Sequence, residues 1–232
     1  MKTDRYSRQT MLPGFGRDGQ EKLAASRVLV AGAGGLGCAA AIYLAGAGVG
    51  HITVADADTV SLSNLQRQVL YGEHQTGLPK AHAAVERLHA LNGSIELKAV
   101  PEFITAANAG ALAAAHDLVI DCTDNFATRY LIDDACAAAG VPWVYGSIGE
   151  FGGQLSLFCG PSGTRYTDLY PERELLCAAP RRTLGVLGAV PGVLGAMQAA
   201  EAVKYLLGMG ESLDGRLFCI DLLTFQSTVL EI

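Results

Sequence analysis

A glycine-rich segment follows the first apolar strand that the sequence predicts, at residues 28–31. This strand opens into Gly32, Gly34, Gly35 and Gly37. Glycines at this spacing let a strand turn sharply into a helix, so that backbone N–H groups and the positive end of the helix dipole face a phosphate group. The alternative interpretation is that these glycines serve only the tight packing of strand on helix. Because the glycines lie between a predicted strand and a predicted helix, the pattern favours a nucleotide site.

Polar and charged residues follow the next predicted strand, at residues 52–55. Asp56 lies nineteen positions past Gly37, where an acidic residue can accept hydrogen bonds from a ribose. The segment after Asp56 contains further polar and cationic residues that suit a nucleotide, whereas the corresponding segment of a dehydrogenase would usually form another helix. These residues are Asp58, Asn64, Arg67, Gln68 and Lys80, and a later strand leads into Asp124 and Asn125. Taken singly, Arg67 and Lys80 would be solvated surface charges, and the aspartates would be strand-end or helix caps.

The chain has 232 residues, of which 50% are hydrophobic and 17% are charged. It can bury the core of one large α/β domain, and we interpret residues 1–232 as a single domain. The formal net charge of −6 argues against nucleic-acid binding, which needs a basic face. Two uncharged runs, at residues 28–50 and 184–200, are interrupted by glycines or Pro191 and do not predict membrane spans. The first residues do not resemble a signal peptide, so we expect a cytoplasmic protein.

Apolar strands alternate with helical periods through the first two thirds of the sequence. Parallel strands are predicted at residues 28–31, 52–55, 96–100, 118–121 and 143–146, with helices at 35–47, 80–91, 106–116 and 125–139. Pro79 and Thr105 precede two of these helices as start signals. The prediction is an α/β fold with a doubly wound, mainly parallel Rossmann-like sheet, whose ligand crevice lies at the carboxyl ends of the strands.

The pattern changes after Gly149. Residues 152–158 alternate as an antiparallel strand, and no helix follows at once. A loop at 160–183 carries Cys177 and the basic pair 181–182, and a long apolar helix at 190–208 and strands at 217–221 and 226–231 close the chain. The predicted organisation is an N-terminal helical arm (1–26), a nucleotide-binding part (27–149) and a part with antiparallel strands (150–232).

Several of these segments resemble, in the same order, the motifs of the ThiF/MoeB/HesA family, whose members are related to ubiquitin-activating enzymes. The similarity covers nearly the whole chain. It rests on residues 5–9 (Arg-Tyr-Ser-Arg-Gln), 32–37, 56–58, 61–68, 77–80 and 121–125, and it extends to 152–154 and 192–195. Six motifs in register are far more specific than any one of them.

The resemblance implies an enzyme that uses ATP to adenylate the C-terminal Gly-Gly carboxylate of a ubiquitin-like sulfur carrier, ThiS- or MoaD-like, and releases pyrophosphate. A carboxylate that attacks the α-phosphorus approaches a polyanion, so cations are needed at the triphosphate. By similarity, Asp56 holds the ribose and Asp124 holds a Mg²⁺ ion. Arg8, Arg67 and Lys80 are the implied cations. The other implied nucleotide contacts are Asp58, Asn64, Gln68 and Asn125, together with Gly32, Gly34, Gly35 and Gly37.

Two residues have implied roles that involve a partner. Arg8 would reach the active site of the other subunit of a homodimer, although N-terminal segments are commonly mobile. Cys177 matches in position a cysteine that handles the activated carrier in some relatives, and the basic pair 181–182 would favour its thiolate. The alternative is an inert loop cysteine. Residues 150–232 would bind the carrier and form the dimer, and a sulfurtransferase or cysteine desulfurase would be a further partner in thiamine, molybdopterin or another sulfur-transfer pathway.

The cysteines depart from the family pattern. Many relatives carry two Cys-x-x-Cys pairs that bind zinc, whereas the six cysteines of this chain include no such pair. A tetrahedral zinc site needs four closely placed ligands, so we expect no structural zinc. Without that clamp, local packing around Leu169, Tyr170, Leu175 and Leu176 is expected to hold the 160–183 segment.

Two other functions compete with adenylation. An NAD-dependent oxidoreductase could use the same glycine loop, but it needs a proton donor and a substrate anchor in a second domain. The five histidines lie mostly in helical or loop contexts, without a clear catalytic setting. A non-catalytic binding partner is disfavoured because each position that the family uses for catalysis is occupied.

Overall fold

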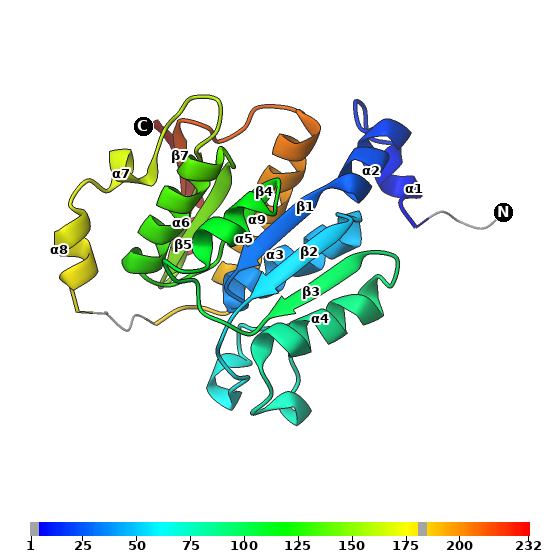
Figure 1. The fold of residues 1–232 in the computed structure, drawn as a ribbon, viewed down its shortest axis with the longest axis horizontal. Coiled ribbons are helices and arrows are strands. Elements are labelled where there is room, and N and C mark those ends of the chain that lie inside the picture. The colour runs from blue at the N-terminus through cyan, green and yellow to red at the C-terminus, as the bar shows by residue number, and fades with distance from the viewer. Residues whose placement is uncertain (1–4, 181–184) are drawn as a thin grey trace.

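The computed structural model describes residues 5–180 and 185–232, which Figure 1 shows as a ribbon. One sheet of eight strands runs in the order β3-β2-β1-β4-β5-β6-β7-β8. Its parallel strands are β1 (Arg27–Ala31), β2 (His51–Ala55), β3 (Glu96–Val100), β4 (Leu118–Asp121) and β5 (Trp143–Gly149). The predicted parallel sheet is confirmed, and β5 continues three residues beyond its predicted end.

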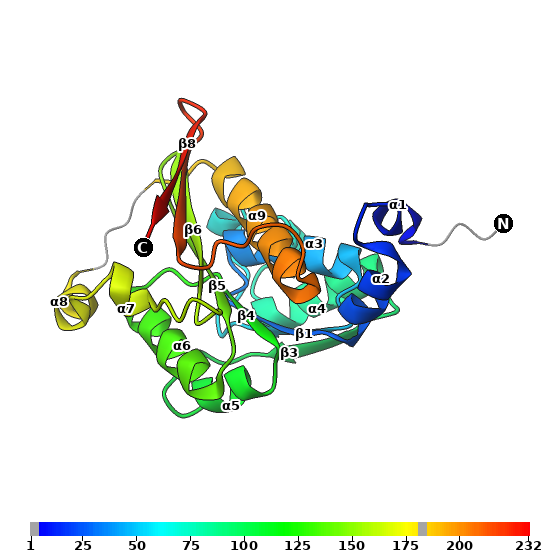
Figure 2. The same ribbon diagram turned by 90° about the horizontal axis from the view of Figure 1, so that it is seen from above.

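Helices cover both faces of the parallel strands (Figure 2). On one face lie α3 (Gly35–Ala47), α4 (Lys80–Leu91) and α9 (Ala189–Leu207), and on the other lie α5 (Ala109–Ala114) and α6 (Phe126–Ala139). This is the doubly wound arrangement expected when right-handed crossovers join parallel strands. Among the described helices, none is both long and apolar enough to cross a membrane.

The start predicted for α5 is wrong. The helix begins at Ala109, three residues later than predicted, and Asn108 occupies the N-cap position in place of Thr105. The Asn108 side chain instead closes a turn before the helix, because its Oδ1 accepts a hydrogen bond from the N–H of Thr105 at 2.8 Å. Such side-chain bonds to the backbone compete with helix formation.

The sheet becomes antiparallel from β6 (Gly152–Phe158) onward, as predicted. β6 folds back on β5 through a tight connection at Glu150 and Phe151, and β7 (Arg216–Asp221) and β8 (Gln226–Glu231) follow in antiparallel pairing. Strands β6 to β8 therefore extend the sheet of β1 to β5 rather than forming a sheet of their own.

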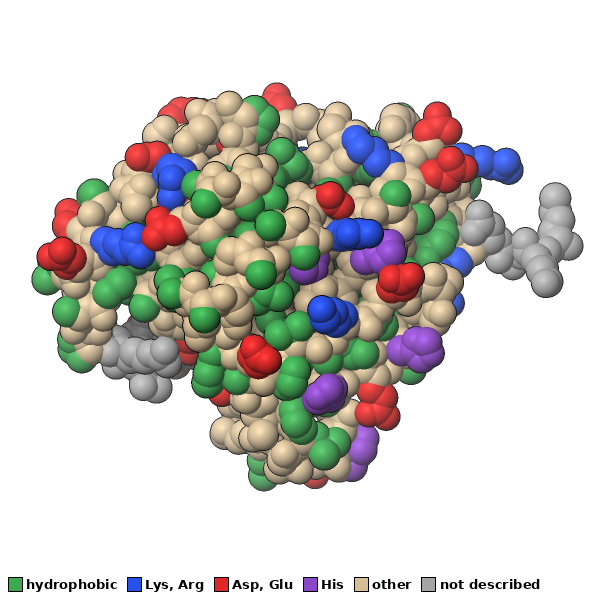
Figure 3. Space-filling view, in the orientation of Figure 1, with side chains coloured by type: hydrophobic (Ala, Val, Ile, Leu, Met, Phe, Trp, Pro, Cys, Tyr) green, Lys and Arg blue, Asp and Glu red, His purple; other side chains and the backbone are tan. Residues whose placement is uncertain are grey.

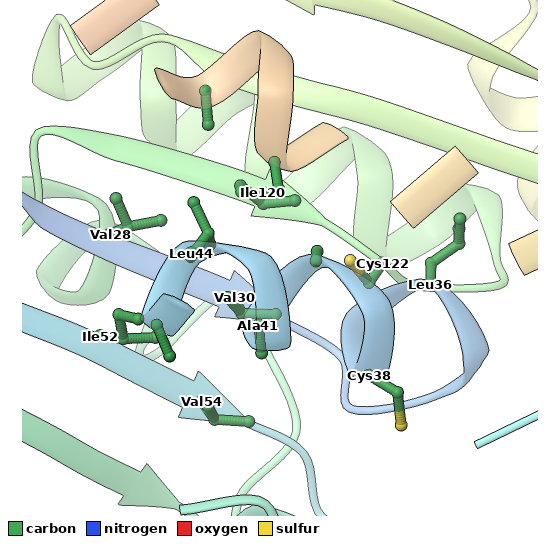
Figure 4. Packing of buried hydrophobic residues seen from close by; sticks show 14 of the residues in the cluster. Val28, Val30, Leu36, Cys38, Ala41, Leu44, Ile52, Val54, Ile120 and Cys122 are labelled. Carbon is green, nitrogen blue, oxygen red and sulfur yellow. The ribbon is translucent and has the colours of Figure 1, made fainter. Parts of the chain in front are cut away.

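Alternate residues of the central strands enter two separate cores. In β1, Val28 and Val30 contribute to the core under α3, whereas Leu29 and Ala31 contribute to the core under α5 and α6, as the two-residue period of a strand requires. Figure 4 shows Val28 and Val30 near α3 residues, among them Ala41 and Leu44. This packing fixes the start of α3 directly beyond the carboxyl end of β1.

The N-terminal arm, which is helical as predicted, consists of α1 (Ser7–Thr10) and α2 (Gly16–Ala25). Gln9 donates a hydrogen bond from Nε2 to the carbonyl of Ala47 at 2.8 Å, and Arg5 donates from Nη1 to the carbonyl of Leu91 at 2.9 Å. These carbonyls belong to the C-terminal ends of α3 and α4. The arm therefore lies at the amino ends of the parallel strands, as Figure 1 also shows.

Two short helices, α7 (Tyr166–Leu169) and α8 (Arg173–Ala178), occupy much of the segment predicted as a loop. Leu169, Tyr170 and Leu176 pack partly against the core under α6, as expected. The expectation for Leu175 is wrong: the residue is 69% exposed, because it is one position from Leu176 and so points about 100° away around the short helix. The basic pair 181–182 lies outside the described residues.

Two glycines of α3 differ in their surroundings. Gly37 is in the first turn, where a Cβ would overlap the carbonyl oxygen of Gly32. Gly46 is exposed near the end of the same helix, and a Cβ there would meet no described atom within 4 Å other than those of its chain neighbours and of the helix's own backbone. Close approach of two backbone segments thus requires glycine at 37, whereas position 46 has no such requirement.

Gly37→Ala is expected to lower the free energy of unfolding by about 1–3 kcal/mol, the usual cost of overpacking. Gly46→Ala is the control and should raise it by about 0.5–1 kcal/mol, because alanine restricts the unfolded chain and favours helix. Urea unfolding of both variants measures this. Equal stability of the two variants would contradict the close approach of Gly37 to Gly32.

Candidate active site

The glycine loop begins where β1 ends. Gly32 has a φ of +98°, which glycine adopts readily, and a Cβ there would lie 2.7 Å from the carbonyl oxygen of Cys122. The loop is therefore pressed against the carboxyl end of β4. Within the described residues, no hydrogen bond uses the N–H groups of Gly34, Gly35, Leu36 and Gly37. Such N–H groups at the start of a helix form a site for an anion.

Asp56 holds this loop from the end of the neighbouring strand β2. Its Oδ2 accepts a hydrogen bond from the N–H of Ala33 at 2.7 Å, and its Oδ1 accepts one from the N–H of Asp58 at 2.8 Å. Burial raises the pKa of the Asp56 carboxyl above its ordinary value, and these two bonds and the charge of Lys80 partly oppose that shift. Each carboxylate oxygen has a further lone pair, so Asp56 can still accept a bond from a ribose hydroxyl.

Lys80 is a buried cation at the first position of α4. Its Nζ lies 3.0 Å from Oδ2 of Asp58, and its backbone N–H donates to the carbonyl of Asp58 at 2.9 Å. Only 5% of the Lys80 side chain is exposed, against 58% of the Asp58 side chain. The interpretation of Lys80 as a solvated surface charge is therefore excluded. An ammonium group has three N–H donors, of which one is used here, so two remain for an anion.

Arg67 reaches the glycine loop through a tight turn after the short helix η1 (Leu62–Asn64). The carbonyl of Asn64 accepts a hydrogen bond from the N–H of Arg67 at 3.1 Å. A Cβ at Gly35 would lie 3.5 Å from Cγ of Arg67, so this side chain runs beside the start of α3. Within the described residues, its guanidinium makes one long hydrogen bond, 3.5 Å from Nη1 to the carbonyl of Ser63. Most of its donors remain available to phosphate oxygens.

Gln68 is buried beside the same loop. The residue is 3% exposed, and its Nε2 lies 3.8 Å from the position of a Cβ on Gly34. The Oε1 atom of Gln68 is buried and has no hydrogen-bond partner among the described residues. Buried acceptors usually have a partner, so this atom and the unbonded N–H groups of the loop fit a site that a nucleotide completes.

The loop after β4 lies next to the glycine loop, because Asp121 of β4 pairs with Ala31 of β1. Asp124 is exposed in this loop, as a ligand for a hydrated metal ion would be. Asn125 is the N-cap of α6, and its Oδ1 accepts a hydrogen bond from the N–H of Thr128 at 2.9 Å. The hypothesis that Asp124 also caps this helix is therefore wrong.

Sequence reasoning missed Arg129, which holds the same loop from within α6. Its Nε lies 3.2 Å from Oδ2 of Asp121, both side chains are buried, and its Nη2 donates to the carbonyl of Thr123 at 2.9 Å. Complete burial raises the pKa of Asp121, and the Arg129 guanidinium opposes that shift. A signal was present in the sequence, since an aspartate that ends an apolar, buried strand needs a partner.

Arg8 and Cys177 lie away from this site. The arm contacts the C-terminal end of α3, whereas the glycine loop precedes its N-terminal end, and the 13 residues of α3 span about 20 Å. Arg8 is exposed and makes no hydrogen bond to a described residue. Cys177 is exposed on α8, the helix at the left margin of Figure 1.

Residues 5–180 and 185–232 contain no group of three or more His, Cys, Asp or Glu side chains that could hold a metal ion. The expected lack of structural zinc stays a prediction.

The fold and the site define a Rossmann-like protein with a glycine loop of unbonded N–H groups, two nearby cations and a carboxylate at the carboxyl edge of its sheet. The chain belongs to the ThiF family, whose sequence model matches residues 6–232. The family resemblance of the sequence motifs is therefore confirmed.

Known relatives have named activities. The chain is 45% identical over 226 residues to the sulfur carrier protein adenylyltransferase of Thermus thermophilus, covering 95% of this chain and 83% of that protein. It is 44% identical over 226 residues to the molybdopterin-synthase adenylyltransferase of Escherichia coli, covering 96% of this chain and 89% of that protein. The crystal structure of E. coli MccB with ATP superposes with a TM-score of 0.87, at 21% identity over 100% of this chain and 71% of that one. This last likeness shows the fold.

Binding of ATP is expected to weaken as the pH falls through the raised pKa of Asp56, because the protonated carboxyl can no longer accept two strong hydrogen bonds, from the N–H groups of Ala33 in the loop and of Asp58 after β2. Asp56→Asn should bind ATP about tenfold more weakly at neutral pH, the size of one lost hydrogen bond, and should lack this part of the pH dependence. Calorimetric titration of both proteins across the acidic range measures the effect. Identical pH profiles would show that Asp56 does not control the loop.

Proposed function

We propose that this protein uses ATP to adenylate the C-terminal Gly-Gly carboxylate of a ubiquitin-like sulfur carrier. The observation that carries the proposal is the 44–45% identity, over at least 95% of the chain, to adenylyltransferases of a sulfur carrier protein and of molybdopterin synthase. The site supports it, because the unbonded N–H groups of the glycine loop lie beside Arg67, and Lys80 supplies a buried positive charge at the start of α4, paired with Asp58 after β2.

The chemistry needs charge stabilisation more than proton transfer. An oxygen of the ionised carrier carboxylate attacks the α-phosphorus, and the bond from that phosphorus to the oxygen bridging the β-phosphate breaks. Pyrophosphate leaves with the bonding electron pair. In the proposed roles, loop N–H groups hold a phosphate while Arg67 and Lys80 stabilise the negative charge that grows on the leaving group. Asp124 would hold Mg²⁺, which when bound adds positive charge at the phosphates.

The relatives give the oxidoreductase hypothesis no support. The sheet also disfavours it. A dinucleotide-binding sheet continues in parallel through a second nucleotide-binding half, whereas β6 pairs with β5 in antiparallel orientation. The space that a second half would occupy is taken by strands that extend the sheet in the opposite sense.

We infer that the protein works as a homodimer in which Arg8 enters the partner's site. Arg5 and Gln9, on either side of Arg8, are bonded to the carbonyl ends of α4 and α3. This anchoring holds the exposed Arg8 on the outside of the molecule, about one helix length from the glycine loop of its own chain. A second chain is then needed to bring Arg8 to a phosphate, with residues 150–232 contributing to the carrier and dimer surfaces.

Further assignments belong to the same proposal. On the face seen in Figure 3, Lys and Arg side chains are interspersed with Asp and Glu, which suits a protein carrier better than nucleic acid. Cys177 is exposed, so it is accessible to an activated carrier.

We also propose that the protein acts in the cytoplasm, in thiamine or molybdopterin supply or a related pathway. A cysteine desulfurase or a sulfurtransferase would be the sulfur donor.

Exchange of labelled pyrophosphate into ATP should depend on a carrier with a free Gly-Gly carboxylate, tested with a panel of ThiS- and MoaD-like proteins. Arg67→Ala should lower the exchange rate on the order of a thousandfold, because it stabilises transition-state charge. Arg87→Ala is the matched control, since Arg87 is exposed on α4, and it should leave the rate unchanged. Tight NADH binding without ATP binding would reject the function.

Mixing Arg8→Ala subunits with Lys80→Ala subunits should restore activity, because a mixed dimer contains one site in which both cations are intact. Each variant alone should be nearly inactive. The measurement is pyrophosphate exchange after subunit exchange, with the mixed dimer verified by differential tagging. Mixed dimers without recovered activity would rule out a shared site.

A further inference from the structure

A buried tyrosine lies behind the glycine loop. Tyr71 is 8% exposed, and its hydroxyl donates a 2.8 Å hydrogen bond to the carbonyl of Ala33. Tyr71 follows Gln68 in a turn closed by its own N–H, which donates to the carbonyl of Gln68 at 3.2 Å. The segment that delivers Arg67 and Gln68 to the loop therefore also supports the loop from behind.

Both backbone polar groups of Ala33, its N–H and its carbonyl, are hydrogen-bonded to side chains. Its N–H donates to Oδ2 of Asp56 at 2.7 Å, and its carbonyl accepts from Tyr71 and, at 3.6 Å, from the thiol of Cys38. Both donors to the carbonyl are buried side chains. The Ala33 carbonyl therefore points into the protein interior, away from the side on which a ligand would enter.

The direction of this carbonyl determines the direction of the next N–H group. The peptide between Ala33 and Gly34 is trans, and in a planar trans peptide the C=O and N–H bonds point in opposite directions. A carbonyl held inward by Tyr71 thus directs the N–H of Gly34 outward. That N–H is one of those in the loop without a partner in the described residues.

Without such support, the loop could rotate. Gly34 and Gly35 follow Ala33 directly, and glycine permits many backbone conformations at little steric cost. Rotation of the peptide by half a turn would present the carbonyl oxygen, which is partly negative, to the phosphate site and would remove one N–H donor from it. A glycine-rich loop that binds an anion therefore benefits from a fixed carbonyl.

We propose that Tyr71 is a positioning residue for the nucleotide, which fixes the peptide between Ala33 and Gly34 so that the N–H of Gly34 faces a phosphate group. This inference rests on the proposed use of ATP, but it concerns binding rather than transfer to a carrier. Tyr71 does not itself contact the phosphate. It acts through the backbone of the loop.

The donors behind the loop stay protonated at neutral pH. Burial raises the pKa of the Tyr71 phenol above its ordinary value and raises the pKa of the Cys38 thiol to about 12. Both groups therefore remain hydrogen-bond donors over the range in which Asp56 changes its charge, so an acidic pH weakens the Asp56 side of the support alone.

The test compares Tyr71→Phe with Tyr130→Phe. Tyr130 is the matched control, because its buried side chain also donates from its hydroxyl to a backbone carbonyl, that of Tyr170 at 2.6 Å, away from the glycine loop. Isothermal titration with Mg-ATP should give a dissociation constant raised about tenfold for Tyr71→Phe and unchanged for Tyr130→Phe. Thermal unfolding of both variants measures the loss of stability, which is expected in each.

A purely structural role of Tyr71 would not change ATP binding selectively. In pyrophosphate exchange, Tyr71→Phe should raise KM for ATP about tenfold and leave KM for the carrier unchanged. Replacement of Tyr71 by 4-aminophenylalanine, which keeps an N–H donor at the same position, should restore ATP affinity. Equal ATP affinity of Tyr71→Phe and the unsubstituted protein would overturn the inference, and so would poor folding of both Tyr71 variants.

The outcomes separate this inference from the proposed function. If the unsubstituted protein binds Mg-ATP but exchanges no pyrophosphate with any carrier, the adenylation proposal fails, while the titrations still decide the role of Tyr71. If exchange occurs and Tyr71→Phe binds ATP normally, only the role of Tyr71 fails. If the unsubstituted protein binds no Mg-ATP, both fail.

Discussion

Three backbone segments meet at one point of this molecule: the end of β1, the first turn of α3 and the end of β4. They can meet because Gly32 and Gly37 carry no side chain, and a Cβ at either position would overlap a backbone carbonyl. This contact puts the N–H groups at the start of α3 at the carboxyl edge of the sheet, between the residues that end β2 and β4. Every other group of the candidate site is arranged around it.

Buried charge surrounds that contact and is paired on each side. Lys80 lies against Asp58, and Arg129 lies against Asp121, so neither cation is left alone in the interior. Removal of one partner from such a pair is more damaging than replacement of both, which ties the loops after β2 and β4 to fixed positions. The Asp121–Arg129 pair thus holds the loop after β4, and Asp58 holds Lys80 in place beside the site, while Arg67 keeps most of its donors open.

Much of the fold follows from local patterns. The strands and the long helices agree with the sequence prediction within a few residues, because short apolar strand runs alternate clearly with helical segments in this chain. The errors fall where side chains bond to nearby backbone or where short helices form. Asn108 delays the start of α5, and Leu175 points outward from α8. Such details depend on single contacts that leave no periodic signal.

By itself the sequence determined the glycine loop, the order of motifs and the identity of the polar residues near the nucleotide, because spacing along the chain decides how a strand turns into a helix. Only the tertiary structure decided that Lys80 is buried, that Asn125 rather than Asp124 caps α6, and that Arg8 lies at the opposite end of α3 from the loop. It also decided that Tyr71 supports Ala33, thirty-eight positions earlier. These facts depend on how segments far apart in the chain pack together, and spacing along the chain does not encode distance across a fold.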